Sequence, residues 1–511
     1  MGEVVGPRSS SPDTAVEPMD LILAAVREAA ADCGVADPAG VLRAVDAVHA
    51  VRTTSWSYAT AAATLAARVG ATPRHTADTT VGGHWPARLL DDAAARLAAG
   101  ESDVALVVGG EAQATVTALA KAGIDPVADL GWSREPGGPP AFDPEELGTA
   151  AMRDSGVVLP TRVYPLFQQA LDAVDGLPPA RAAARAAATF ARLTEVAAVN
   201  PIAWDPRVRS AEDVGTPRPD NRMICEPYPK ALNAMPHVDQ AAAVLVMSAA
   251  AARARGIAED RWVHVRGGAG ATDSADVLAR PSFARSGALA TAFDRALDRA
   301  EVDAADLDLV DVYSCFPVVP LLVAHHLGAG DRVLSATGGH AAFGGPLSSY
   351  SLHAIAAVTR QLREGRARTA AVHANGGYLT HQHVVVLSRR PARAHAGDPD
   401  PVGVDADGVP PFVDARDLVA GAGGPVPATI ETWTVEHSRD GGPATAIVVA
   451  RTRDGVRTAA TTAPGDVAAA AALSRDALGD DLTTHIGRPV RLVPAGDGVA
   501  VDPSPTAQER T

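Results

Sequence analysis

The sequence has few cysteines and no long apolar run. Its three cysteines, Cys33, Cys225 and Cys315, are too few and too widely spaced for a disulfide framework or a zinc cluster, which fits a reducing compartment. No apolar stretch reaches the length of about 18 residues that a bilayer span needs, and no basic segment followed by an apolar one opens the chain. We therefore expect a cytoplasmic protein with no membrane span and no metal site.

A shortage of positive charge excludes further classes of partner. The 511 residues carry 60 acidic and 45 basic side chains, for a net charge of −15. Nucleic acids and anionic membranes bind to positive fields, so neither is expected as a partner, and an anionic ligand would need a local cationic site. Hydrophobic residues make up 47% of the chain, which is ample for the buried cores of several domains.

One sequence unit occurs twice, with a spacing of 265 residues between Gly100 and Gly365. Residues 79–112 and 343–377 each contain a Gly-Gly turn, a segment with helical apolar spacing, a glycine stop and an apolar strand. This duplication predicts two similar α/β halves around a pseudo-dyad, with the N-termini of the paired helices converging on one site. The alternative is two ordinary α/β units that happen to look alike.

The remaining segments divide the chain into further units. Residues 1–255 form the first α/β half, including an inserted loop domain at about 116–225, and residues 256–392 form the second half. We expect residues 393–420 to form a linker and residues 421–511 to form a small all-β domain with alternating strands and a hairpin turn at Asp454-Gly455. That pattern suits a barrel of the oligonucleotide/oligosaccharide-binding (OB) type, with a sandwich as the alternative. We expect this domain to contact the α/β body or a partner protein.

Four segments resemble the thiolase superfamily over residues 4–390: TTVGGHWPARLLDDAAARLAAGESDVALVVGG, PHVDQAAAVLVMS, DVYSCF and TGGHAAFGGP. They are similar to the nucleophile turn with its helix, to the strand after the loop domain, and to two segments of the second half that carry catalytic residues. The branch with sterol-carrier-protein-type thiolases, and thiolase-like proteins with an extra C-terminal domain, is the most similar. The resemblance implies a five-layered αβαβα fold and a coenzyme A thioester as substrate or ligand, with no covalently bound cofactor.

The reactive residues that this resemblance implies are absent. The nucleophilic cysteine would stand at Gly83 or an immediate neighbour, Gly345 replaces the histidine of the family's Gly-His-Pro segment, and residues 373–375 lack the second cysteine. Residues of a concerted catalytic set act as a unit, so losing one already removes most activity. Ordinary thiolysis or Claisen condensation through these positions is therefore not expected.

Other side chains near these positions are candidates for a role. Tyr313 stands where thiolases have Asn or His, and the superfamily's retro-aldolase branch has a tyrosine there; a tyrosine that anchors a loop through its hydroxyl is the alternative. Cys315 is a candidate nucleophile, but we favour the alternative that it is a small apolar residue buried in the core. His84 reads as a ligand contact or as an exposed helix cap. The expected ligand cleft comprises Gly82, Gly83, His84, Gly338, Gly339, His340, Gly344, Gly345, Asn375 and Gly376.

Three functions follow from these observations. The first is an acyl-CoA-binding protein of the acetyl-CoA acetyltransferase family with altered catalytic groups. The second is a carbon–carbon lyase that uses Tyr313 on a β-hydroxyacyl-CoA, with the β domain resembling the separate small β partner of the aldolase branch. The third is a catalytically silent acyl-CoA-binding or scaffolding protein. Arg181, Arg185 and Arg192 lie in the inserted region, where family members commonly contact coenzyme A, or they form a solvated face.

The oligomeric state stays open between monomer and homodimer. The opening strand of the family is expected to lie mostly before residue 1, which would leave one edge of the first sheet without its strand.

Overall fold

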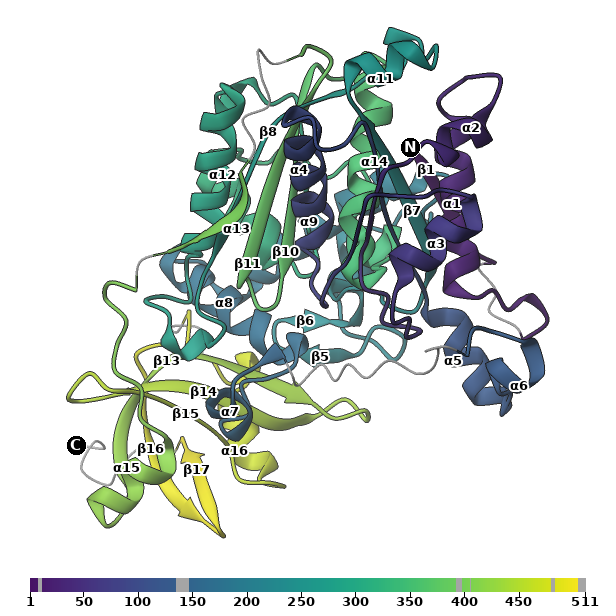
Figure 1. Cartoon of the computed structure of the whole chain (residues 1–511). Helices are drawn as coiled ribbons and strands as arrows, with labels where there is room; N and C mark the ends of the chain where they lie inside the picture. Colours follow the sequence, from purple (N-terminus) through teal and green to yellow (C-terminus); the bar gives the residue numbers. More distant parts are fainter. Residues whose placement is uncertain (8–11, 135–146, 392–397, 405, 479–482, 504–511) are drawn as a thin grey trace.

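The computed structural model describes residues 1–7, 12–134, 147–391, 398–404, 406–478 and 483–503. These residues form an α/β body with two sheets, a helical loop region and a smaller β domain (Figure 1). Among them, every helix is too short or too polar to cross a membrane.

The first sheet has the strand order β1-β7-β4-β2-β3. Its strands are β1 (Gly2–Val5), β2 (Ala47–Ala50), β3 (His75–Asp78), β4 (Val104–Ala112) and β7 (Asp239–Met247). Strand β1 pairs antiparallel with β7, in a register that sets Gly2 opposite Ala243. The expectation that the opening strand is missing is therefore wrong. Four residues are enough to fill this edge of the sheet, too short a run to stand out as a strand in the sequence.

The second sheet has the order β12-β8-β11-β10-β9. Its strands are β8 (His264–Thr272), β9 (Leu309–Val312), β10 (Thr369–Gly376), β11 (His381–Ser388) and β12 (Asp398–Gly403). The series β8-β11-β10-β9 repeats the series β1-β7-β4-β2 of the first sheet. In the first sheet β4 follows the duplicated helix and lies between antiparallel β7 and parallel β2. In the second sheet β10 follows the duplicated helix and lies between antiparallel β11 and parallel β9. The predicted duplication is confirmed by this topology.

Two central helices pack against each other between the sheets. They are α4 (Trp85–Ala98) and α14 (Tyr350–Arg363), each 14 residues long, and their first residues are 265 positions apart. Pro86 suits the first turn of α4, where its missing N–H is not needed. The two helices bury apolar residues in one shared core with inner faces of both sheets, including Leu89, Leu90, Ala93, Leu352, Ile355 and Val358.

Outer helices complete the five layers. The first sheet is covered by α1 (Pro18–Ala31) and α3 (Ala61–Val69), with the short helices α2 (Pro38–Arg43) and α11 (Ala249–Ala254) at its rim. The second sheet is covered by α12 (Gly287–Ala300), and α13 (Val318–Leu327) lies against α12 and β9. The five-layered αβαβα fold is therefore as expected.

The inserted loop region is mainly helical where it is described. It contains α5 (Gln113–Ala122), α6 (Pro126–Leu130), α7 (Ala150–Asp154), α8 (Pro160–Val174), α9 (Pro179–Ala198), α10 (Ala211–Gly215), β5 (Met223–Cys225) and β6 (Tyr228–Pro229). Helix α9 follows the alanine–arginine segment that the sequence indicates, and its apolar stripe is buried against the body.

The C-terminal domain contributes five strands to a seven-stranded sheet, and the two ends of its five-strand path approach each other. Its strands pair in the order β15-β14-β13-β16-β17, and β15 and β17 at the ends of that path lie in contact. One sheet that nearly closes fits the OB-type barrel rather than a sandwich. The strands are β13 (Val426–His437), β14 (Pro443–Thr452), β15 (Arg457–Thr461), β16 (Pro489–Ala495) and β17 (Gly498–Asp502), with helices α15 (Ala415–Ala422) and α16 (Val467–Ala472).

Parts of the expected linker, residues 393–420, are regular structure. Strand β12, which lies in this range, joins the second sheet beside β8. Helix α15 begins in the same range and packs on β16 and β17, so the β domain begins before residue 421. A short edge strand and a short helix flanked by glycine and proline give a sequence pattern that is easily taken for a linker.

The β domain contacts the body extensively. Strand β5 of the loop region pairs with β13, setting Cys225 opposite Glu436. The Arg457 side chain is 0% exposed and donates to the carbonyl oxygens of Leu278 (2.7 Å) and Arg280 (2.5 Å) in the body. Its other nitrogens donate to the Glu431 carboxylate, at 2.8 and 2.5 Å. This domain is therefore held on the body by buried polar contacts.

We expect Arg457→Met to lower the free energy of unfolding by about 3–5 kcal/mol, because it leaves the two buried carbonyl groups without their donor and the Glu431 carboxylate paired with Arg451 alone. Arg451→Met is the matched control, since Arg451 pairs with the same Glu431 carboxylate but is 33% exposed and should contribute at most about 1 kcal/mol. Denaturant unfolding followed by circular dichroism measures both; equal losses would contradict the assigned role of Arg457.

Candidate functional site

The N-terminal end of α4 and the turn before α14 meet at the centre of the body. The Gly82 amide N–H donates to the Ser348 hydroxyl (3.0 Å), which ties the two duplicated turns together. The β10–β11 turn and the segment after β9 reach the same place, because Asn375 and Tyr313 both lie against Gly83. The predicted convergence of two helix N-termini is therefore present, and it brings the expected cleft residues together.

Gly83 is enclosed so tightly that no side chain fits there. A Cβ atom at this position would lie 2.5 Å from the Asn375 carbonyl oxygen and 2.5 Å from both Cε2 and Cζ of Tyr313. Such distances are far below van der Waals contact, so even alanine would force the backbone or the tyrosine ring to shift. The position that the resemblance assigns to a nucleophilic cysteine is thus filled by the Tyr313 ring.

Tyr313 is held by its hydroxyl and by two rings. The hydroxyl donates to the Leu347 carbonyl oxygen (3.1 Å), and the ring centroid lies 4.1 Å from that of His340 and 5.5 Å from that of Tyr350. Leu347 has a φ of 42°, which is unusual for a non-glycine residue and needs such an anchor. Burial raises the pKa of the Tyr313 hydroxyl above its ordinary value, although the side chain keeps some exposed surface.

His340 is enclosed between aromatic rings. Its ring stacks on Tyr350 with a centroid distance of 3.6 Å, and neither ring nitrogen has a hydrogen-bond partner within the described part of the chain. Burial lowers the pKa of His340 well below its ordinary value, so the imidazole is neutral at pH 7. The ring therefore contributes packing to this site, and no described nucleophile is hydrogen-bonded to it.

A buried carboxylate shapes the segment that carries His340. The Asp311 Oδ2 atom accepts hydrogen bonds from the Ala336 N–H (2.7 Å), the Thr337 N–H (3.1 Å) and the Ser335 hydroxyl (3.1 Å). Burial raises the pKa of Asp311 to about 6. The Thr337 hydroxyl in turn lies 2.5 Å from the Tyr350 hydroxyl, which links this turn to the start of α14.

Cys315 lies in a buried polar cluster. Its side chain is 7% exposed, and its sulfur lies 3.9 Å from the Asn375 amide nitrogen. Burial raises the pKa of the Cys315 thiol to about 12, so the reactive thiolate is nearly absent at pH 7. These surroundings favour the buried, unreactive interpretation of this cysteine.

The Asn375 side chain is already satisfied within the protein. Its Oδ1 accepts from the Gln382 amide (2.8 Å), and its Nδ2 donates to the Tyr164 hydroxyl (2.9 Å). Gln382 in turn contacts His373 (2.7 Å). Burial lowers the pKa of His373 to about 4. Tyr164 and Gln382 could not be found from the sequence, because they come from α8 and β11 and belong to no local motif.

His84 is buried rather than exposed. It precedes α4 with 7% of its surface accessible, makes no side-chain capping bond, and stacks on His381 with a centroid distance of 4.7 Å. Any side chain at Gly376 would overlap the His84 ring. Burial lowers the pKa of His84 well below its ordinary value, so this imidazole is also neutral. The expectation of an exposed helix cap is wrong.

Most glycine amides of the expected cleft bind to protein atoms. The Gly338 N–H donates to the Ser335 hydroxyl (2.9 Å), the Gly339 N–H to the Thr337 hydroxyl (3.3 Å) and the Gly345 N–H to the Met235 carbonyl oxygen (2.9 Å). Gly344 has a φ of 115°, and a Cβ there would lie 2.5 Å from the Gln240 side-chain oxygen. The glycines therefore serve close packing of the turn, and these three N–H groups are not free for a ligand.

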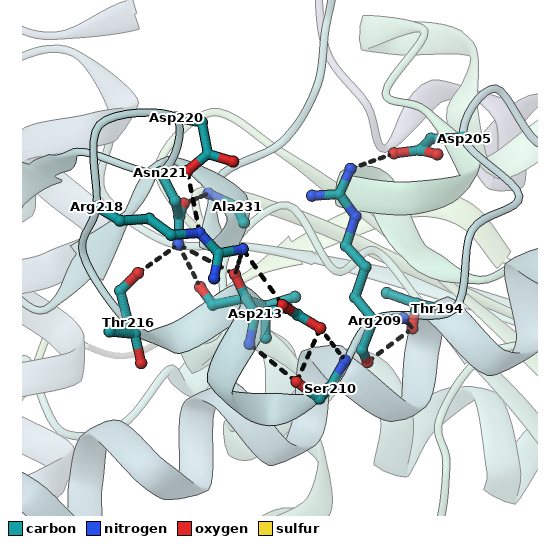
Figure 2. A network of polar contacts seen from close by, with 11 residues as sticks. Thr194, Asp205, Arg209, Ser210, Asp213, Thr216, Arg218, Asp220, Asn221 and Ala231 are labelled. Carbon is teal, nitrogen blue, oxygen red and sulfur yellow. Dashed lines mark hydrogen bonds and ion pairs between the residues drawn. The ribbon is translucent and has the colours of Figure 1, made fainter.

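A polar network fixes the segment that covers this turn (Figure 2). Ser210 and Asp213 form a capping box at α10, and the Arg218 guanidinium donates to the Asp213 carboxylate (3.4 Å). The Asn221 amide group closes the network by donating to the carbonyl oxygens of Val214 (3.1 Å) and Thr216 (3.1 Å) and by accepting from the N–H of Ala231 (2.8 Å). Residues 210–231 are thereby held in one arrangement.

The segment that follows this network reaches the candidate site. The Met235 N–H donates to the His340 carbonyl oxygen (3.1 Å), and the Met235 carbonyl oxygen receives the Gly345 N–H. The loop region thus covers the glycine-rich turn by backbone pairing. Backbone contacts of this kind leave no signature in the identity of the side chains.

A groove of about 390 Å³ runs between α9 and α13. Arg192, Arg332 and His325 line it, and Leu193 separates it from the candidate site, since a Cβ at Gly339 would lie 2.6 Å from the Leu193 side chain. Arg185 also lines the groove but pairs with the carboxylates of Asp172 (2.9 Å) and Asp175 (2.5 Å). Arg181 is exposed on α9 outside the groove.

Among the described residues, no group of three or more His, Cys, Asp or Glu side chains is arranged to hold a metal ion.

The comparisons with known proteins agree with this architecture. Residues 408–487 match the family model of the thiolase-like protein type 1 additional C-terminal domain. No curated protein sequence matches the chain significantly. Among solved structures, a monomeric SCP2-thiolase-like protein type 1 from Mycobacterium smegmatis is 28% identical, with a TM-score of 0.79 over 98% of this chain and 97% of that one.

More distant structures share the fold of the body. Human mitochondrial 3-ketoacyl-CoA thiolase is 16% identical, with a TM-score of 0.53 over 76% of this chain and 96% of that one. The Ltp2–ChsH2 (DUF35) aldolase is 17% identical, with the same TM-score and coverage. The chain thus combines a body with the thiolase fold and a C-terminal domain of the kind that thiolase-like proteins type 1 carry.

Proposed function

We propose that this protein binds an acyl-coenzyme A thioester without forming a covalent acyl intermediate. The observation that carries the proposal is the enclosure of Gly83, where the Tyr313 ring occupies the space that a nucleophile would need. The body keeps the fold and the paired helix N-termini of a thiolase, whereas the reactive groups have been replaced by packed side chains. We also infer a monomer, because the Mycobacterium smegmatis protein with the same two parts is monomeric.

The remaining polar groups do not restore the missing chemistry. Covalent acyl transfer needs an activated nucleophile beside a base. Cys315 is held as a protonated thiol, and no described bond connects it to His340 or to another base. Gly345 offers no side chain in place of the family's histidine. Binding without turnover is the function that these residues support best.

The groove between α9 and α13 supports the coenzyme A part of the proposal. In a chain with a net charge of −15, Arg192 and Arg332 place two guanidinium groups on one groove. Arg192 donates to the Asp331 carbonyl oxygen and Arg332 to that of Leu307 (2.7 Å), which leaves further N–H donors on each group for phosphate oxygens. Leu193 lines this groove and also lies against Gly339 of the glycine-rich turn.

A second candidate function is carbon–carbon bond cleavage of a β-hydroxyacyl-CoA. Two observations favour it: Tyr313 keeps some exposed surface beside Gly83, and this chain carries its own OB-type domain, whereas the structurally similar aldolase is a complex with a DUF35 protein. In such a reaction a base removes the β-hydroxyl proton, a carbonyl product leaves and the acyl fragment is protonated. The raised pKa of Tyr313 and its bond to Leu347 oppose the role of base.

The enclosure of Gly83 predicts a coupled stability effect. Gly83→Ala should lower the free energy of unfolding by about 1–3 kcal/mol through overpacking, and by clearly less in a Tyr313→Ala background, because the ring is one of the two groups it would strike. Gly424→Ala is the control, since a Cβ there meets open space. Additive effects of the two substitutions in denaturant unfolding would show that Tyr313 does not fill this space.

Titration with acetyl-CoA, a longer acyl-CoA and free coenzyme A tests the proposal directly. We expect saturable binding by isothermal calorimetry, with ligand and protein masses unchanged afterwards. The Arg192→Gln and Arg332→Gln substitutions should each weaken binding about tenfold, the effect of losing one charge-assisted hydrogen bond. Arg181→Gln, on the same helix but outside the groove, should leave affinity unchanged. Detection of acylated protein would refute binding without a covalent intermediate, and absence of binding would refute coenzyme A thioesters as the ligand.

Incubation with a β-hydroxyacyl-CoA distinguishes the second candidate. Under the leading proposal no shorter acyl-CoA and no carbonyl product form, and Tyr313→Phe binds the thioester as the wild type does. Turnover that Tyr313→Phe abolishes, while Tyr164→Phe retains it, would instead establish the lyase, because Tyr164 is the neighbouring tyrosine that bonds only within the Asn375 cluster and to Gly377.

A further inference from the structure

A second cavity lies at the opposite end of the two central helices. It has a volume of about 400 Å³ and is formed by the last turns of α4 and α14, the end of β7 and the start of β8. This end of the body carries α11 and lies away from the C-terminal domain in Figure 1. Since α4 and α14 are each 14 residues long, the cavity is separate from the site at their N-termini.

The wall of this cavity is strongly apolar. Seven large apolar side chains that line it are only half-buried: Leu97, Leu245, Val246, Met247, Trp262, Val263 and Val265. So many partly exposed apolar groups around one concave surface are unusual for a protein without a ligand there. A hydrocarbon chain in the cavity would remove this surface from water, which is favourable.

One buried hydroxyl in the wall lacks a partner. Thr359 is 1% exposed, lines the cavity, and its Oγ1 forms no hydrogen bond with any described residue. Burial of a hydroxyl without a partner is costly. If the side chain turned toward the cavity, a ligand oxygen there would supply the missing bond.

Cationic groups stand beside this hydroxyl. Arg363 is four residues after Thr359 on α14, so the two side chains share one face of the helix. Arg363 donates to the Asp32 carboxylate (2.6 Å) and to the Arg261 carbonyl oxygen (2.6 Å), and Arg261 donates to the Asp32 carbonyl oxygen (2.8 Å). The Arg261 guanidinium also lies 3.8 Å from the Asp32 carboxylate, so two guanidinium groups that line the cavity pair with one carboxylate.

The other titratable groups facing the cavity do not cancel this positive charge. Burial lowers the pKa of His264, which keeps its imidazole neutral, and the Cys33 thiol has a raised pKa because it is buried. The amino group of Met1 also contacts Asp32. Apart from Asp32, the lining residues that the structure describes include no carboxylate.

We propose that this cavity binds a linear aliphatic carboxylate. The hydrocarbon tail packs among Leu245, Met247 and Trp262, and the carboxylate accepts hydrogen bonds from Arg363 and the Thr359 hydroxyl. This inference is independent of the proposed acyl-coenzyme A site, because it uses neither the groove at α9 nor the glycine-rich turn.

Calorimetric titration with decanoate tests the proposal, with decanol and decylamine as probes of the head group. Decanoate should bind saturably and at least about tenfold more tightly than either probe, since only the carboxylate pairs with Arg363. Binding should also change the fluorescence of the wild type but not of Trp262→Phe. Equal affinity for the three compounds, or no saturable binding, would overturn the proposal.

Matched variants locate the ligand. Ala98 lines the mouth of the cavity and is exposed, so Ala98→Trp should block binding, whereas Ala99→Trp at the next exposed position should not. Arg363→Gln should weaken decanoate about tenfold and remove the preference over decanol, while Arg366→Gln on the nearby surface leaves both unchanged.

Thr359→Val, which keeps the side-chain volume, should weaken decanoate without lowering the melting temperature. Unaltered decanoate binding in folded Ala98→Trp and Thr359→Val proteins would place the ligand elsewhere and refute the site.

Discussion

The packing of α4 against α14 between the two sheets is the constraint on which the rest of the structure depends. Their contact buries the apolar core shared by both halves and fixes the register of the duplicated units, so that Gly82 meets Ser348 across the pseudo-dyad. The helices are equal in length, so their N-termini lie near each other at one end and their C-termini near each other at the opposite end. One end gathers the glycine-rich turns, and the other leaves the apolar cavity between β7 and β8.

At the glycine-rich end, packed aromatic rings occupy the positions where reactive groups would be expected. In the space where a nucleophile, a base and an oxyanion would be expected, the Tyr313, His340 and Tyr350 rings lie in contact, and their polar atoms are either bonded within the protein or electrically neutral. The Asp311 carboxylate organises the turn from behind by accepting several hydrogen bonds at once. A site with these contacts lacks the charged or nucleophilic groups that covalent acyl transfer requires.

Local patterns predicted the fold and the vacancy of the site, and long-range contacts explain what they missed. Helical apolar spacing and the glycine stops identified the two central helices. The resemblance to thiolases then implied that the missing nucleophile would stand at Gly83 or an immediate neighbour, and the structure shows no room for a side chain at Gly83. The four-residue strand β1 and the edge strand β12 were missed because so short a run carries no clear period. His84, before α4, stacks on His381 of β11, almost 300 residues away in the sequence. Such a long-range pair cannot be predicted from local sequence patterns.

The C-terminal domain changes how the loop region can act. Strand β5 of the loop region is an added strand of the β domain, and Arg475 of that domain reaches Gln169 (2.6 Å) and Asp172 (2.8 Å) of α8. Loop segments that cover a binding site usually come from the least stable parts of a protein. Here the cover is fixed from two sides, by β13 through β5 and by the glycine-rich turn through Met235. Opening the cover would break buried pairing with the β domain, so the additional domain holds the candidate site in its closed, packed form.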